Sequence, residues 1–92
     1  MTALIIVDLT PIDKEALTTY SALAAETLSA FGGEFLAKGG IIALHGDSAF
    51  STKVVIQFPS HQHANDWYHS DAYQKIIPTR NKGMDSQFHL IG

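Results

Sequence analysis

The sequence predicts a single α+β domain in which strands and helices follow one another in the order strand, helix, strand, strand, helix, strand. Two observations predict this order. Segments 3–9 and 53–58 carry apolar residues on both faces, which is typical of strands at the centre of a sheet. Two longer segments repeat apolar residues at spacings of three and four, which is typical of amphipathic helices. The chain has 92 residues, 46% of them hydrophobic, which suits one domain spanning residues 1–92.

The first strand is expected at residues 3–9, where Ile5 and Val7 point to one face and Leu4 and Ile6 to the other. The segments 34–38 and 87–91 are also strand-like but more polar. A polar side chain is easier to accommodate at a sheet edge, where one flank meets water, so we expect these two strands at the edges. Gly39 and Gly40 precede another apolar run, so the second strand is expected to bend or bulge and then continue.

The first helix is predicted from a single apolar stripe that comprises Leu17, Tyr20, Ala24, Leu28 and Phe31. Thr10, Pro11 and Asp13 supply start signals, because Pro suits the first turn and Thr or Asp accepts backbone N–H bonds at an N-cap. Gly32 and Gly33 follow the stripe. A glycine there adopts the left-handed conformation that ends helices, so the helix is expected to end at this pair.

The second helical region is expected to start near Ser60, with Ser70 as the N-cap of a further helical stretch. Pro78 is expected to kink or end that stretch, because proline lacks the N–H and clashes with the preceding turn. Gly83 is expected to close it.

When right-handed crossovers are applied to this order, the compact solution is a ferredoxin-like βαββαβ fold. It has an antiparallel four-stranded sheet with both helices on one face and with the first and third strands at the centre. The other face of the sheet then exposes apolar side chains, and a patch of that kind usually marks an interface. We therefore expect a homodimer that forms through the open sheet face, as in a dimeric α/β barrel.

Composition excludes several classes of partner and site. The formal net charge of −3 offers no footprint for a nucleic-acid backbone, so no nucleic-acid partner is expected. No segment approaches the ~20 apolar residues that span a bilayer, and residues 1–4 lack the basic region of a signal peptide, so the protein is expected to be cytoplasmic and free of membranes. The chain has no cysteine and no phosphate-binding glycine motif, and the sequence indicates no cofactor.

Four stretches carry a family resemblance: residues 31–40 (FGGEFLAKGG), 54–60 (VVIQFPS) and 67–74 (WYHSDAYQ), followed by Arg80. In this order and spacing they resemble the family called domain of unknown function 1330. The resemblance implies a dimeric α/β barrel, similar in fold to cofactor-free monooxygenases, muconolactone isomerases and chlorite dismutases. It implies no reaction, because one scaffold hosts many functions. The family often has Arg where this chain has Lys38, and a lysine cannot make the bidentate grip of an arginine on an anion.

Three residues are candidates for ligand binding. Trp67 and Tyr73 flank Ser70 and are expected to line a pocket between helix and sheet, although both also suit the aromatic core of a small domain. Arg80 is the only arginine and is suited to hold the carboxylate of a small ligand. The alternative for Arg80 is an ion pair with Asp71, with Asp85 or with a carboxylate of the partner chain.

His45 and His89 are the candidates for proton transfer, because an imidazole exchanges protons near neutral pH. Both fall in apolar strand-like segments, where a histidine also serves as an ordinary hydrogen-bonded residue. His61, His63, Asp66 and His69 follow one another on the second helix, but steps of three drift around the helix and leave the outer pair about 120° apart. No metal site is therefore expected, and these residues are interpreted as a solvated helix face.

Two functions from different classes remain open on the sequence alone. The first is a small dimeric protein that binds or converts a small organic, carboxylate-bearing molecule in a pocket between sheet and helices. The alternative is a non-catalytic dimeric module with a structural or regulatory role.

Overall fold

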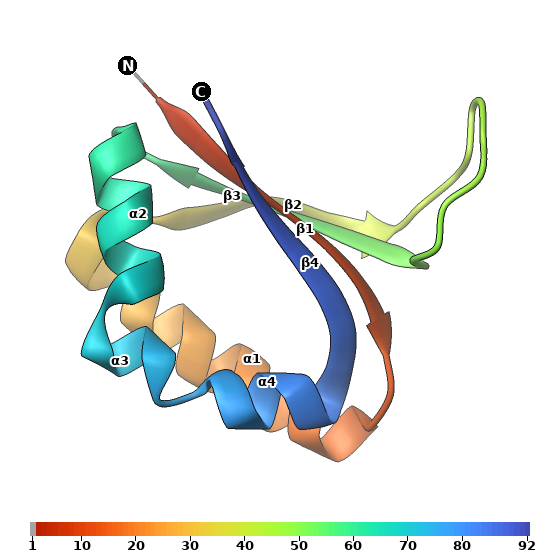
Figure 1. Cartoon of the computed structure of the whole chain (residues 1–92), viewed down its shortest axis with the longest axis horizontal. Coiled ribbons are helices and arrows are strands. Elements are labelled where there is room, and N and C mark those ends of the chain that lie inside the picture. Colours follow the sequence, from red (N-terminus) through yellow and green to blue (C-terminus); the bar gives the residue numbers. More distant parts are fainter. Residues whose placement is uncertain (1) are drawn as a thin grey trace.

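A computed structural model describes residues 2–92 and shows a four-stranded antiparallel sheet with all helices on one face (Figure 1). The elements are β1 (Ala3–Pro11), α1 (Lys14–Leu28), the 3-10 helix η1 (Ser29–Phe31), β2 (Glu34–Gly40), β3 (Thr52–Phe58), α2 (His61–His69), α3 (Asp71–Gln74), α4 (Ile77–Gly83) and β4 (Met84–Ile91). The predicted ferredoxin-like βαββαβ order is confirmed.

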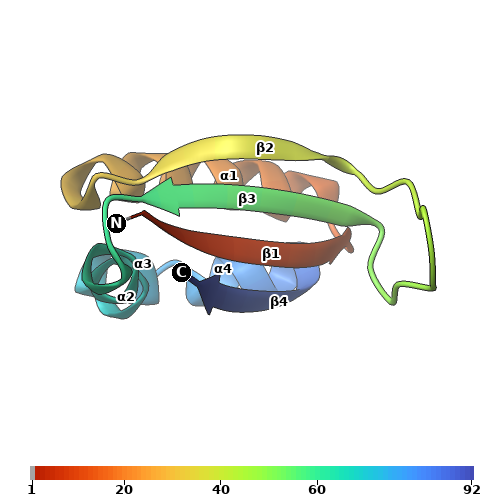
Figure 2. The same ribbon diagram turned by 90° about the horizontal axis from the view of Figure 1, so that it is seen from above.

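The strands lie in the order β2-β3-β1-β4, and each neighbouring pair is antiparallel (Figure 2). Ile5 of β1 lies opposite Ile56 of β3 on one side and Leu90 of β4 on the other. The strands with apolar residues on both faces, β1 and β3, are therefore central, and the more polar β2 and β4 form the edges, as predicted.

The ends of α1 follow the predicted signals. The Asp13 carboxylate accepts a hydrogen bond from the backbone N–H of Ala16 at 3.1 Å, which makes Asp13 the N-cap. After the single turn of η1, Gly32 adopts a φ of 72°, and its N–H donates to the carbonyl of Ser29. This left-handed conformation suits glycine and turns the chain into β2.

The second helical region is divided into three helices. Ser60 and Ser70 cap α2 and α3, as predicted, by accepting hydrogen bonds from the backbone N–H groups of His63 and Tyr73. The helical stretch that follows Ser70 is interrupted between Gln74 and Ile77, just before Pro78, and α4 ends at Gly83, as expected. Pro78 itself does not end a helix. It lies in the first turn of α4, where its missing N–H has no helical partner to lose.

The expected continuation of the second strand is also wrong. The strand β2 ends at Gly40, its bulge lies upstream between Phe35 and Ala37, and residues 41–51 form a loop that extends away from the body of the domain (Figure 1). Ile42 and Leu44 in this loop are 86% and 97% exposed. They have neither a strand partner nor a core to pack against, so their apolar character does not produce a strand.

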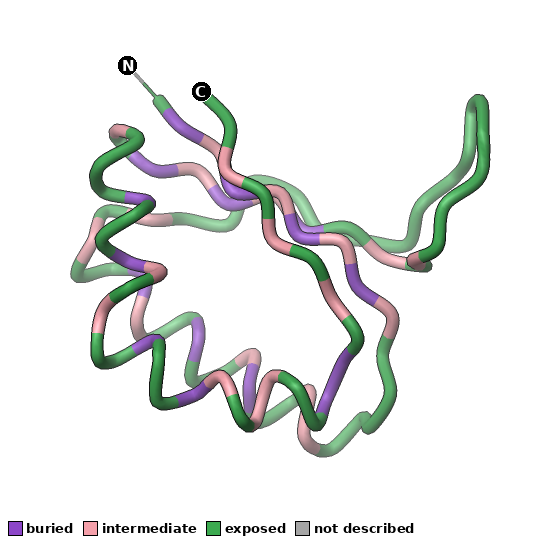
Figure 3. Tube along the Cα trace, in the orientation of Figure 1, coloured by how far each residue is buried: buried purple, intermediate pink, exposed green. Residues whose placement is uncertain are grey.

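The core lies between the sheet and the helices, where the buried positions of both layers face one another (Figure 3). Trp67, Tyr73 and Phe58 are the largest fully buried side chains. No helix of residues 2–92 covers the opposite face of the sheet (Figure 1). Leu4 and Ile6 are half-buried there, and the Asp8 carboxylate pairs with the Lys53 ammonium at 3.0 Å. None of the helices within residues 2–92 has the length and apolar character that crossing a bilayer requires.

Candidate functional site

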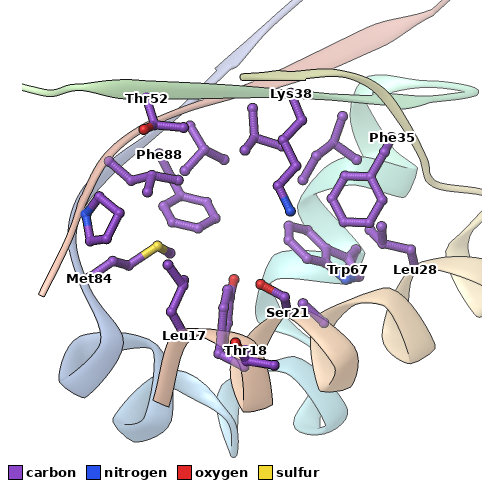
Figure 4. A pocket seen from close by; sticks show the side chains of 17 residues that line it. Leu17, Thr18, Ser21, Leu28, Phe35, Lys38, Thr52, Trp67, Met84 and Phe88 are labelled. Atoms are coloured by element: carbon purple, nitrogen blue, oxygen red, sulfur yellow. The ribbon is translucent and has the colours of Figure 1, made fainter. Parts of the chain in front are cut away.

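A cavity of about 630 Å³ lies between the inner face of the sheet and α1 (Figure 4). Its walls are mainly apolar. Val7 and Leu9 of β1 and Val54 of β3 form part of the sheet side, and Leu17 and Leu28 of α1 form part of the helix side. These are the residues that strand alternation and the helix stripe direct toward the core, so the cavity occupies space that the core leaves unfilled.

Lys38 is the only charged residue that lines this cavity, and Figure 4 shows its nitrogen directed into the space. In residues 2–92 the one ion pair is that of Lys53 with Asp8, so the Lys38 ammonium has no carboxylate partner there. Phe35 and Lys38 of the edge strand β2 are exposed, and so is Thr18 of α1. The cavity therefore opens to solvent between β2 and α1.

The bulge in β2 explains why Lys38 points inward. Phe35 lies opposite Ile56 and Lys38 lies opposite Val54, and both of these β3 partners face the core. In a regular strand, positions 35 and 38 would lie on opposite faces. The extra residue in the bulge brings both to the inner face. Alternation alone therefore missed Lys38, and the family's frequent Arg at this place was the only signal that pointed to it.

Trp67 lines the same cavity from α2 and is 1% exposed. Its indole N–H donates to the Thr27 hydroxyl of α1 at 2.9 Å, and its ring centroid lies 4.3 Å from that of Tyr73. Tyr73 is fully buried and is not part of the cavity wall. Of the two predicted aromatic residues, Trp67 is therefore the one in a position to contact a ligand, and Tyr73 packs behind it.

The partners of the Arg80 guanidinium include two phenol hydroxyls. Its guanidinium donates hydrogen bonds to the hydroxyls of Tyr68 at 3.1 Å and Tyr73 at 3.2 Å, and it lies 4.9 Å from the centroid of the Phe88 ring. The alternative ion pairs with Asp71 and Asp85 are not formed. The Tyr73 hydroxyl lies in turn 2.8 Å from the hydroxyl of Tyr20, which lines the cavity.

Burial is the main cause of the raised pKa values of Tyr20 and Tyr73. Removal from water raises the pKa of Tyr20 far above its usual range, and the neighbouring Tyr73 adds to the effect. Burial also raises the pKa of Tyr73, although its hydrogen bonds with Tyr20 and Arg80 partly oppose the increase. Both phenols are therefore neutral at physiological pH and are hydrogen-bond donors rather than bases.

A second cavity, of about 360 Å³, lies between α2, α4 and β4 and is lined in part by Tyr68, His69, Arg80 and His89. Arg80 therefore lies at a different cavity from Trp67, and the site that the sequence suggested as one is divided in two. His89 also lines the second cavity. It is an exposed residue of β4 and lies opposite Ile6, whose side chain is on the open face of the sheet.

His45 lies in the exposed loop 41–51 and lines neither cavity, so the strand context expected for it is wrong. The two histidines predicted for proton transfer are not brought together. His61, His63, Asp66 and His69 are exposed along α2, and the part of the chain that is described contains no group of three or more metal-ligating side chains.

A family model described as "Domain of unknown function (DUF1330)" matches residues 2–92. No curated protein matches the chain. Among solved structures, the chain is similar to RPA0582, a protein of unknown function from Rhodopseudomonas palustris, with a TM-score of 0.79 and 14% identity over 98% of this chain and 80% of that chain. A dimeric ferredoxin-like protein of unknown function from Jannaschia sp. CCS1 gives a TM-score of 0.75 and 12% identity over 100% and 99% of the two chains.

SnoaB, a cofactor-independent oxygenase from Streptomyces nogalater, gives a TM-score of 0.72 and 11% identity over 99% of this chain and 91% of that chain. At these identities the similarities show the fold and carry no activity from one protein to the other.

Proposed function

The chain belongs to the DUF1330 family, and from that premise we propose that it is a homodimer that binds a small organic carboxylate in the cavity between its sheet and its helices. One observation carries the proposal: a single unpaired ammonium, that of Lys38, projects into an otherwise largely apolar space.

The volume of the cavity supports a ligand. Protein interiors are close-packed, and a void lined by apolar side chains costs stability. This cavity of about 630 Å³ opens to solvent, so its apolar walls meet water, and a ligand that covers them gains the free energy of burying that surface. Pockets for small organic molecules typically range from about 300 to 1,000 Å³.

The chemistry of the lining supports an acid with an apolar body. The ammonium of Lys38 donates hydrogen bonds and accepts none, so its natural partner is an anion. It stands at the mouth between β2 and α1, where a carboxylate keeps partial contact with water while an apolar tail extends inward past Leu17 and Trp67. Burial of that tail supplies most of the affinity, and Lys38 supplies orientation and selectivity.

Exposed apolar residues support the homodimer. Leu4 and Ile6 lie on the uncovered sheet face, and Ile42 and Leu44 stand in solvent on the loop 41–51. Apolar side chains left on an uncovered face or in solvent are typical of a surface that another chain covers. The Jannaschia protein is described as dimeric and shares the fold, which supports a second copy of this chain as the cover.

The binding experiment uses Trp67, the only tryptophan, as an internal reporter at the cavity wall. Decanoate and decanol are titrated into the wild type, Lys38→Met and the control Lys75→Met, whose lysine is exposed on a different part of the surface. We expect decanoate to change the fluorescence and its affinity to fall at least about tenfold in Lys38→Met alone. Decanol should bind both variants as it binds the wild type.

If decanoate binds Lys38→Met as well as it binds the wild type, the assigned role of Lys38 is wrong. If neither compound binds the wild type, the non-catalytic module becomes the better account of the protein.

The dimer is tested by light scattering. The wild type should have twice the mass of one chain, and Ile6→Asp should have the mass of one chain because it places a charge on the open face. The control is Ile12→Asp, at an exposed position between β1 and α1. A wild type with the mass of one chain at micromolar concentration contradicts the proposed dimer.

A further inference from the structure

The hydrogen-bonded chain of Arg80, Tyr73 and Tyr20 has a direction that can be worked out from donors and acceptors. A guanidinium has only N–H donors, so in its contact with Tyr73 the phenol oxygen accepts. The Tyr73 hydroxyl therefore has its own hydrogen still to place.

Tyr73 is fully buried, and among residues 2–92 the only acceptor within reach of its hydrogen is the hydroxyl oxygen of Tyr20 at 2.8 Å. The opposite direction, from Tyr20 to Tyr73, would leave the Tyr73 hydrogen buried without an acceptor, which costs about 1–3 kcal/mol. Tyr73 is therefore the donor and Tyr20 the acceptor.

The hydroxyl hydrogen of Tyr20 then has no acceptor among residues 2–92. Tyr20 lines the large cavity, whereas Tyr73 and Arg80 do not. We propose that Tyr20 presents its hydroxyl hydrogen to the ligand, and that the cavity therefore selects carboxylic acids that carry a second, neutral acceptor oxygen, such as the carbonyl of a keto acid. This inference rests on the proposed binding function and names the class of ligand.

Two properties of the site favour this donor. Hydrogen bonds in series polarise one another, so the fixed charge of Arg80 at the far end strengthens the Tyr20 hydroxyl as a donor. Burial holds the pKa of Tyr20 well above its usual range, so the hydrogen stays in place at neutral pH. Lys38 and Tyr20 are then both donors, and a ligand with two acceptors satisfies both.

The test compares two probe acids that differ only in the proposed acceptor, 4-benzoylbenzoate with a ketone and 4-benzylbenzoate with a methylene in its place. Calorimetric titration of the wild type should show the ketone bound about 10- to 100-fold more tightly, because a buried hydroxyl left without a partner costs about 1–3 kcal/mol. In Tyr20→Phe the ratio should fall to about one or below, and the methylene acid should bind more tightly than it binds the wild type, because no hydroxyl is then left without a partner.

The outcomes separate this inference from the binding function. Equal affinities for the two acids in the wild type overturn the role of Tyr20 and leave carboxylate binding intact. A ketone preference that persists unchanged in Tyr20→Phe also overturns it. Binding of neither acid to the wild type overturns both proposals.

Infrared spectroscopy of the wild-type complex gives a readout that does not depend on the folding of a variant. The ketone stretch of bound 4-benzoylbenzoate should move to lower frequency than in an apolar solvent, in the wild type and in Lys38→Met at saturating ligand. An unshifted stretch shows that the carbonyl receives no hydrogen bond and contradicts the proposal.

Discussion

Gly83 lies so close to the backbone of Leu17 that a Cβ atom on Gly83 would stand 2.7 Å from the Leu17 nitrogen and 2.8 Å from its Cα. The carbonyl of Gly83 also accepts hydrogen bonds from the backbone N–H groups of Ile12 and Asp13, at 2.9 and 3.2 Å. The end of α4 is thereby joined to the start of α1. Because Leu17 lines the cavity, this contact also sets the position of one cavity wall.

Substitution of Gly83 by Ala should destabilise the protein by about 1–3 kcal/mol, because the atoms that the new methyl group meets belong to backbone that cannot rotate away. The control is Gly39→Ala, since a Cβ on Gly39 meets nothing within 4 Å. That variant should stay within about 0.5 kcal/mol of the wild type. Urea denaturation measures both, and equal stabilities of the two variants would show that the close approach is relaxed in solution.

The bond between the Trp67 indole and the Thr27 hydroxyl predicts a second stability effect. Thr27→Val keeps the branched shape but leaves the buried indole N–H without an acceptor, at a cost of about 1–3 kcal/mol. Thr27→Ser retains the hydroxyl and should lie close to the wild type. Thermal unfolding followed by Trp67 fluorescence ranks the three proteins, and a Val variant as stable as the Ser variant would contradict the assigned bond.

Sequence patterns predicted the sheet order because the two-sided apolar character of β1 and β3 is a direct consequence of central position. They also predicted the caps at Asp13, Ser60 and Ser70, since a cap depends on residues only three apart in the chain. Such local signals need no knowledge of the rest of the fold.

The candidate site was harder to predict because it depends on contacts between distant segments. Lys38 reaches the cavity only through the bulge in β2, and strand alternation does not reveal a bulge. Tyr20 was recognised as a core residue of the helix stripe, but its bond to Tyr73 joins positions 53 residues apart. Residues 41–46 produced the opposite error, because their apolar run looked like a strand. Apart from the hydrogen bond from the N–H of Ile41 to the carbonyl of Ser51, this run is not paired with a strand among residues 2–92.

The ion pair between Asp8 and Lys53 provides a test of the open sheet face. In one isolated chain the side chains are 21% and 48% exposed, so the pair contributes about 0–1 kcal/mol. If a second chain covers this face, Lys53→Met leaves the Asp8 carboxylate buried without a partner, and the dimer should dissociate at least about tenfold more readily. Sedimentation of the wild type, Lys53→Met and the control Lys75→Met measures this. Unchanged dissociation in Lys53→Met would place the interface elsewhere.

The buried tyrosines predict how stability depends on pH in the alkaline range. An unfolded tyrosine loses its proton near pH 10. Burial raises the native pKa of both Tyr20 and Tyr73, so above pH 10 the unfolded chain binds fewer protons than the native protein. The stability that these two groups contribute is therefore complete below pH 10 and is lost as the pH rises above it, by at most about 1.4 kcal/mol per pH unit for each tyrosine.

Urea denaturation at a series of pH values above 10 should therefore show stability falling with pH in the wild type, with a slope from this pair of at most about 2.7 kcal/mol per pH unit. In Tyr20→Phe the slope should become shallower, because one of the two groups with a raised pKa is removed while Tyr73 stays buried beside Trp67. Tyrosinate absorbance of the native wild type should stay well below that of the unfolded chain at the same pH. Full ionisation of all three tyrosines in the native state, or an identical slope in Tyr20→Phe, would contradict the raised pKa of Tyr20.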